Sequence, residues 1–223
     1  MRLLVIEHEA DSGAALLGRR AVERGFELDV RLPGDLNLPP TAQGYDAVLS
    51  LGASPSVNDI AISGWFAPHL ALLRDADERS VPVFGVCFGA QALAVALGGS
   101  VQRSPIPEIG WYEVETNDPN MVEPGPWLQW HVDAITPPDR ARVIARSKAC
   151  VQAYTMGPHL GVQFHPEVTI DEVTSWATGD PGGPASAGTD ATTVLARFSE
   201  EFPAAVGRAN RLFDRFLIHA GLA

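Results

Sequence analysis

The chain has 223 residues, a hydrophobic share of 46% and a formal net charge of −11. This length and apolar content suffice for one large domain or a modest two-lobed one. The acidic balance argues against nonspecific nucleic-acid binding and against an anionic membrane surface, because both need a basic patch. No run approaches the roughly 20 apolar residues of a membrane span, so no membrane partner is expected.

Strands and helices alternate in the first part of the chain. The predicted strands are 3–6, 26–32, 46–51 and 81–86, and the predicted helices are 13–24, 65–79 and 90–97. This alternation is typical of a parallel sheet covered by helices. Asp11 or Ser12 is expected to cap the first helix. The stretch 33–44, with three prolines and two glycines, is expected to be a loop.

The pattern changes after Gly99, where short strand candidates are separated by turns. These candidates are 101–103, 109–115, 142–147, 150–155 and 161–164. They predict an antiparallel part added to the parallel one. A helix is predicted at 169–176. The composition of 179–190 indicates a flexible linker, and 191–223 is expected to be a C-terminal helical element that Pro203 could interrupt.

The two cysteines, Cys87 and Cys150, occur in a chain whose first residues lack the apolar stretch of a signal peptide. Free thiols in the cytoplasm are the simplest interpretation. The two cysteines do not have zinc-ligand spacing, so neither a metal nor a cofactor is expected.

Cys87 lies at a sharp turn between a predicted strand and a predicted helix. The sequence Gly85-Val86-Cys87-Phe88-Gly89 connects the apolar run that starts at Val81 to a run of good helix formers. This is the arrangement of a nucleophile elbow, with Cys in place of Ser. Glycines at 85 and 89 suit a turn that crowds the neighbouring backbone, and a helix N-terminus favours a thiolate. The alternative is an inert cysteine in the core.

Among the six histidines, only His165 has a suggestive setting. An apolar strand ends in His165-Pro166-Glu167, and Pro166 ends it because proline donates no ladder hydrogen bond. His165 is therefore expected at the carboxyl edge of the sheet, where open α/β folds place their sites. Glu167 can reach back to the imidazole and stabilise its charged form. The alternative is a strand-end histidine followed by a surface glutamate.

Together, these two stretches resemble the class I (triad) glutamine amidotransferases, in particular a stand-alone member similar to the glutaminase domain of GMP synthase. The resemblance covers roughly residues 1–178 and includes further similar segments at 52–59, 108–114, 130–133 and 152–154. It implies a single α/β domain over 1–223. The expected fold is flavodoxin-like, with helices on both faces of a mostly parallel central sheet and a small antiparallel addition.

The resemblance also implies roles for individual residues. Cys87 would attack the side-chain amide of glutamine, His165 would serve as general base and then acid, and Glu167 would orient His165. Ammonia would leave, and water would hydrolyse the γ-glutamyl thioester to glutamate. The oxyanion hole would consist of Gly52, Ala53 and Phe88, and the substrate would be held by Gln91, Trp130 and His131.

Three functions remain open from the sequence. The protein could release ammonia from glutamine for a separate synthetase subunit, since the chain has no P-loop or ATP-grasp sequence of its own. It could instead hydrolyse γ-glutamyl peptides or amides. It could also be a non-catalytic relative that binds a ligand or a partner. Ala53 favours this last function, because the family usually has two adjacent glycines there, and alanine resists a positive φ or a peptide flip.

Overall fold

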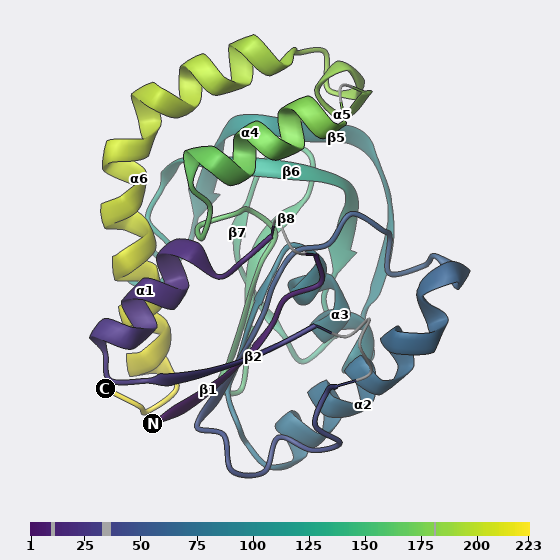
Figure 1. Ribbon diagram of the computed structural model, residues 1–223, viewed down its shortest axis with the longest axis vertical. Helices are drawn as coiled ribbons and strands as arrows, with labels where there is room; N and C mark the ends of the chain where they lie inside the picture. The colour runs from purple at the N-terminus through teal and green to yellow at the C-terminus, as the bar shows by residue number, and fades with distance from the viewer. Residues whose placement is uncertain (10–11, 33–36, 181) are drawn as a thin grey trace.

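The computed structural model describes residues 1–9, 12–32, 37–180 and 182–223. In these ranges nine strands form one sheet with the order β2-β1-β3-β4-β9-β8-β7-β5-β6 (Figure 1). The strands are β1 (Arg2–Ile6), β2 (Glu27–Arg31), β3 (Ala47–Ser50), β4 (Val83–Val86), β5 (Ser100–Thr116), β6 (Gly125–Thr136), β7 (Arg142–Arg146), β8 (Val151–Met156) and β9 (His159–Val162). The helices are α1 (Ala15–Glu23), α2 (Ser63–Glu78), α3 (Phe88–Ala96), α4 (Ile170–Gly179), α5 (Gly182–Ser186) and α6 (Ala191–His219), with a 3-10 turn at Ile60–Ile62.

The sheet has a parallel part and an antiparallel part. Strands β2, β1, β3, β4 and β9 pair in parallel, whereas β9, β8, β7, β5 and β6 pair antiparallel. The predicted α/β fold, a central parallel sheet with an antiparallel addition, is confirmed. Because β4 and β9 are parallel neighbours, their carboxyl ends meet at the same edge of the sheet.

Both faces of the parallel part are buried, which explains the apolar runs of its strands. In β1, Leu3 and Val5 pack with side chains of α1 and α6, while Leu4 and Ile6 pack with side chains of α2 and α3. Figure 1 shows these two helix pairs on opposite sides of the sheet. Successive side chains of a strand point to opposite faces of the sheet, so the apolar run of β1 contributes to two separate cores.

The sequence did not predict β6. On the buried side of this strand are Gln129, His131 and Asp133, so the apolar alternation that indicates a half-buried strand is missing. The predicted strands 101–103 and 109–115 are two parts of the long β5, which has an irregular register between Arg103 and Glu108. The antiparallel part is therefore built mainly from one long hairpin.

Three local predictions also differ from the structure. Helix α6 continues through Pro203, because core side chains hold it on both sides of the proline and proline kinks a helix without always ending it. Part of the predicted linker forms α5. The N-cap of α1 is Ala14, which makes no side-chain hydrogen bond, so Ser12 is not the cap, and Asp11 lies outside the described residues. Of the predicted loop, 33–36 also lies outside the described residues, and 37–44 has no regular structure.

Among the helices that the structure describes, none combines the length and the apolar content needed to cross a membrane.

Asp214 connects α6 to α1 through ion pairs with Arg20 and Arg24. Burial by itself would raise the pKa of Asp214, but the hydrogen bonds and charges of the two arginines outweigh burial and lower it to about 2. A carboxylate with a lowered pKa in the folded chain stabilises the fold above its ordinary pKa. This contribution is lost as the pH falls from about 4 to about 2.

We therefore expect Asp214→Asn to lower the free energy of unfolding by about 2 kcal/mol at neutral pH. Urea denaturation at pH 7 and at pH 3 measures the effect, which should be smaller at pH 3. Asp139→Asn, at an exposed position, is the matched control. Equal losses in the two variants would contradict this role of Asp214.

Candidate active site

Cys87 occupies the turn between β4 and α3 in a strained conformation, with φ 49° and ψ −109°. Such a backbone costs on the order of 1–3 kcal/mol in a residue other than glycine, and it is concentrated at functional sites. The Cys87 N–H donates to the Val162 carbonyl at 2.8 Å, which ties the turn to β9. Phe88 is the first residue of α3, so its N–H has no partner within the helix.

Gly85 and Gly89 make this turn possible by leaving space. A Cβ atom on Gly89 would lie 2.0 Å from the carbonyl oxygen of Ser50, and one on Gly85 would lie 2.8 Å from backbone atoms of Ala90. Neither glycine has a positive φ. The crowding that the sequence predicted at these positions is therefore the reason for both glycines.

His165 and Glu167 form a buried pair at the end of β9. The distance from His165 Nδ1 to Glu167 Oε1 is 2.7 Å, and both side chains are 4% exposed. Burial lowers the pKa of His165, but the charges of Glu167 and Cys87 outweigh burial and hold it well above its ordinary value. Within the described ranges, His165 Nε2 has no hydrogen-bond partner. The pair thus favours the charged form of the imidazole, orients the ring and leaves Nε2 able to donate.

Cys87 and His165 both lie next to Gly52. A Cβ atom on Gly52 would be 3.0 Å from His165 Cε1 and 3.8 Å from Cys87 Cβ. Gln163 Nε2 lies 3.6 Å from the Cys87 sulfur, and the Trp130 carbonyl oxygen lies 3.9 Å from it. These contacts come from three segments of the chain and leave one side of the thiol open.

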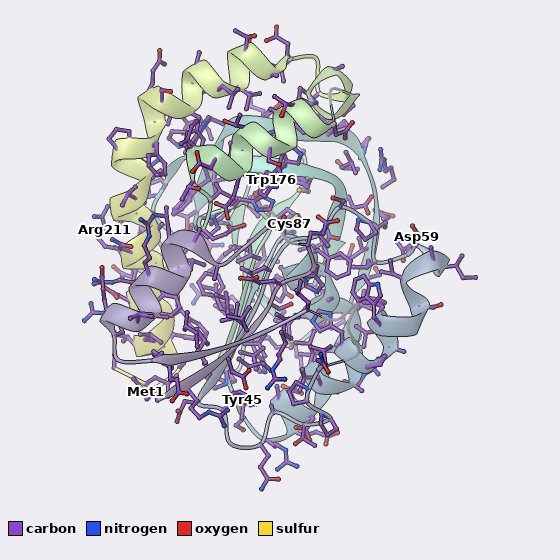
Figure 2. The ribbon with its side chains drawn as sticks, viewed as in Figure 1. Met1, Tyr45, Asp59, Cys87, Trp176 and Arg211 are labelled. Atoms are coloured by element: carbon purple, nitrogen blue, oxygen red, sulfur yellow. The ribbon has the colours of Figure 1, made fainter. Side chains whose placement is uncertain are left out.

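A cavity of about 360 Å³ lies on that open side of the thiol. Figure 2 shows Cys87 near the middle of the molecule and Trp176 of α4 above it. Six of the predicted site residues line the cavity: Cys87, His165, Gly52, Ala53, Trp130 and His131. The other three do not line it. Glu167 lies behind His165, Phe88 is buried, and Gln91 donates to Gln163 Oε1 at 3.3 Å.

The backbone at Ala53 does not require a glycine. Ala53 is not among the described residues with a positive φ. An alanine therefore fits the loop in this conformation without strain.

Sequence reasoning missed a chain of polar side chains, partly to fully buried, behind this loop. His8 Nδ1 lies 3.2 Å from the Gly52 carbonyl oxygen, His8 Nε2 lies 3.5 Å from His69 Nδ1, and His69 Nε2 lies 3.1 Å from Ser50 Oγ. Burial lowers the pKa of His8 to about 4, so the neutral ring donates from Nδ1 to Gly52. The C=O and N–H of one planar peptide point in opposite directions. His8 therefore fixes the direction of the Ala53 N–H.

Trp176 was also missed, because no pattern in its own segment signals that α4 lies over the thiol. Its ring lies 5.0 Å from the ring of His165 and 5.6 Å from that of Trp130, measured between centroids. Gly179, Asp180 and Gly183 continue the same wall of the cavity. The end of α4 and the start of α5 thus shape the entrance.

The comparisons with known proteins all find glutamine amidotransferases or glutamine-hydrolyzing enzymes. The family model "Glutamine amidotransferase class-I" matches residues 10–175. The chain is 36% identical to a glutamine-hydrolyzing GMP synthase of Aeropyrum pernix over 70% of its own length, but spans only 31% of that protein. It is 31% identical to a subunit of the glutamine-hydrolyzing GMP synthase of Ignicoccus hospitalis, over 69% of this chain and 83% of that one.

Solved structures extend the likeness to almost the whole chain. A glutamine amidotransferase from Methylobacillus flagellatus superposes with a TM-score of 0.90 at 26% identity, over 98% of this chain and 94% of that chain. One from Thermotoga maritima superposes with a TM-score of 0.87 at 25% identity, over 97% of this chain and 98% of that one. The likeness in fold therefore includes α5 and α6, which lie outside the family-model match.

Replacing Glu167 with glutamine should lower the pKa of His165, since loss of the nearby charge leaves burial as the stronger influence. In the unaltered chain the imidazole should stay protonated through neutral pH, whereas in Glu167→Gln it should lose its proton at lower pH. An NMR titration of the His165 ring C–H resonance measures this. Glu200→Gln, at an exposed position on α6, is the control. Identical titration curves in all three proteins would exclude the pairing.

Proposed function

The chain belongs to the class-I glutamine amidotransferase family, and on this premise we propose that it hydrolyses the side-chain amide of glutamine with Cys87 as nucleophile. One observation carries the proposal. A cysteine in a strained turn shares a cavity with His165, and His165 is paired with the buried Glu167. A nucleophile, a base and a group that orients the base are what covalent catalysis requires.

In this mechanism the Cys87 sulfur attacks the γ-carbonyl carbon of the substrate. His165 donates its Nε2 proton to the leaving nitrogen, the C–N bond breaks, and ammonia and a γ-glutamyl thioester result. His165 then takes a proton from water, whose oxygen attacks the thioester. The C–S bond breaks, which returns the sulfur as a thiolate, and glutamate leaves. Glu167 orients the imidazole in both steps and stabilises its charged form before the first proton transfer and after the second.

Backbone N–H groups of Phe88 and of the Gly52–Ala53 turn would stabilise the oxyanion. Such donors contribute about 3–4 kcal/mol each to the transition state. The orphan N–H of α3 supports a role for Phe88, and the His8 hydrogen bond supports a fixed Ala53 N–H. Only Ala53 favoured a non-catalytic function, and its backbone conformation removes that argument.

The substrate would be held mainly by the backbone at Trp130 and His131, which line the cavity. Gln91 would act indirectly, because its amide donates to Gln163, and the Gln163 amide faces the Cys87 sulfur. Some relatives are named as single subunits of GMP synthase, which supports a version in which the ammonia passes to a separate synthetase subunit.

A second candidate function, hydrolysis of γ-glutamyl amides, is favoured by the size of the cavity. Its volume of about 360 Å³ lies within the range of roughly 300–1,000 Å³ for pockets that hold drug-sized ligands. Four residues of its wall, Trp176, Gly179, Asp180 and Gly183, lie outside the family-model match. We propose that this wall contacts a leaving amine larger than ammonia.

We also propose that residues 1–223 act as one domain. Phe213 and Phe216 of α6 belong to the core beneath the parallel strands, and Val194 and Phe198 pack with Trp111 of β5. A helix that contributes to two apolar clusters is expected to unfold together with the sheet.

Cys87→Ala should reduce hydrolysis by at least about 10³-fold, because the nucleophile of such a group of residues cannot be replaced. Release of ammonia from glutamine and of amine from γ-glutamyl amides measures the activity and separates the two candidate functions. Circular dichroism and the urea midpoint check that the variant is folded. Full activity in a folded Cys87→Ala protein would overturn the assignment.

His8→Phe should lower kcat by about 10-fold and leave KM nearly unchanged, since one hydrogen bond to the Gly52 carbonyl is lost. Phenylalanine retains the aromatic contacts of the ring with Trp65 and Phe88. Trp65→Phe, which alters the same packing but no hydrogen bond of Gly52, is the control. Equal effects of the two substitutions on kcat would show that packing alone explains the result.

A further inference from the structure

Glu108, His131 and Cys150 meet in the interior of the antiparallel part. One ligand atom from each lies within 4.8 Å of the others. Glu108 belongs to β5, His131 to β6, and Cys150 precedes β8. The first two residues are buried, at 2% and 4% exposure, and the thiol is partly buried. The proposed hydrolysis uses neither the Glu108 carboxylate nor the Cys150 thiol.

If His131 is neutral, no positive charge balances the Glu108 carboxylate at its contact with the ring. His131 Nδ1 lies 3.0 Å from the carbonyl oxygen of Asp133, and a carbonyl only accepts, so the ring hydrogen is on Nδ1. Nε2 then presents a lone pair at 3.2 Å from Glu108 Oε2. In the described part of the chain, this Nε2 has no hydrogen-bond partner of good geometry. A second proton or a metal ion must lie between the two atoms.

The distances between these atoms are close to those of a tetrahedral zinc site. Bond lengths of about 2.0–2.2 Å to N and O and about 2.3 Å to S imply separations of about 3.4 Å for N to O and about 3.6 Å for S to O. The observed separations are 3.2 Å from His131 Nε2 to Glu108 Oε2 and 3.9 Å from Cys150 Sγ to Glu108 Oε2. These two separations differ from the tetrahedral values by a few tenths of an ångström, and the third, from His131 Nε2 to Cys150 Sγ, is within 4.8 Å.

The surrounding hydrogen bonds orient the three groups as outer partners of a metal site do. Glu108 Oε2 accepts from Ser147 Oγ and from Gln152 Nε2, both at 2.9 Å. Gln152 Oε1 in turn accepts from Gln129 Nε2 at 2.8 Å. His131 donates its other ring N–H to a backbone carbonyl, which fixes its tautomer.

A second cavity borders this cluster. Glu108 and Ser147 line a second cavity, of about 750 Å³, between β5 and the start of α6. His131 lines the cavity over Cys87 on the other side. Glu108 and His131 thus border different cavities, and the second cavity gives a route to Glu108 that does not pass Cys87.

We infer that Glu108, His131 and Cys150 bind a Zn²⁺ ion that fixes the strand carrying Trp130 and His131. The ion replaces the thiol proton, so one proton is released for each Zn–S bond formed. The inference does not depend on the proposed hydrolysis.

Zinc content measured by mass spectrometry tests the inference on tag-free full-length protein that has been incubated with ZnCl₂ and desalted. One zinc ion per chain is expected in the unaltered protein and in Cys87→Ala, and none in Cys150→Ala or Cys150→Ser. Calorimetric titration with Zn²⁺ in two buffers of different ionisation enthalpy should give about one released proton per ion.

A chain that retains no zinc would overturn the inference and leave a protonated His131 paired with Glu108. So would zinc that is kept in the Cys150 variants but lost in Cys87→Ala, since the ion would then lie at the nucleophile. The two substitutions at Cys150 differ in size and polarity, and circular dichroism establishes which of them is folded.

Discussion

The rest of the structure depends on how closely the start of α3 approaches the ends of β3 and β4. At Gly89 the helix backbone lies so near the Ser50 carbonyl that no side chain fits between them. This approach forces Cys87 into a positive φ and points the N-terminus of α3 at the edge of the sheet. Strain at one residue is thus maintained by packing at two others. The glycines contribute only the absence of side-chain atoms.

The same edge receives the end of β9, so the order of the strands determines which side chains meet Cys87. Both motifs that were evident in the sequence, the cysteine turn and His165-Pro166-Glu167, are local and have strong turn signals. Their meeting could be predicted because carboxyl ends of neighbouring parallel strands share an edge. The apolar runs 3–6 and 46–51 similarly predicted β1 and β3, since both faces of these strands are buried.

The polar parts of the interior could not be predicted in this way. Strand β6 buries Gln129, His131 and Asp133, so its pattern indicates no apolar face. The contacts of His8 with Gly52 and His69 join residues from three elements, and no spacing in one segment signals them. Hydrogen bonds satisfy such groups only in the folded chain. Their partners become apparent only when the strand order is known.

The adjacency of β4 and β9 has a consequence for how the chain acquires its chemistry. The four strands β5 to β8 lie between them in sequence, so their pairing closes a long loop and belongs to the slow, non-local contacts of folding. Until β9 docks, the thiol of Cys87 has no imidazole beside it. A partly synthesised or partly folded chain therefore contains the Cys87 thiol but not the His165 imidazole that the proposed function requires, and the two groups meet only when the sheet is complete.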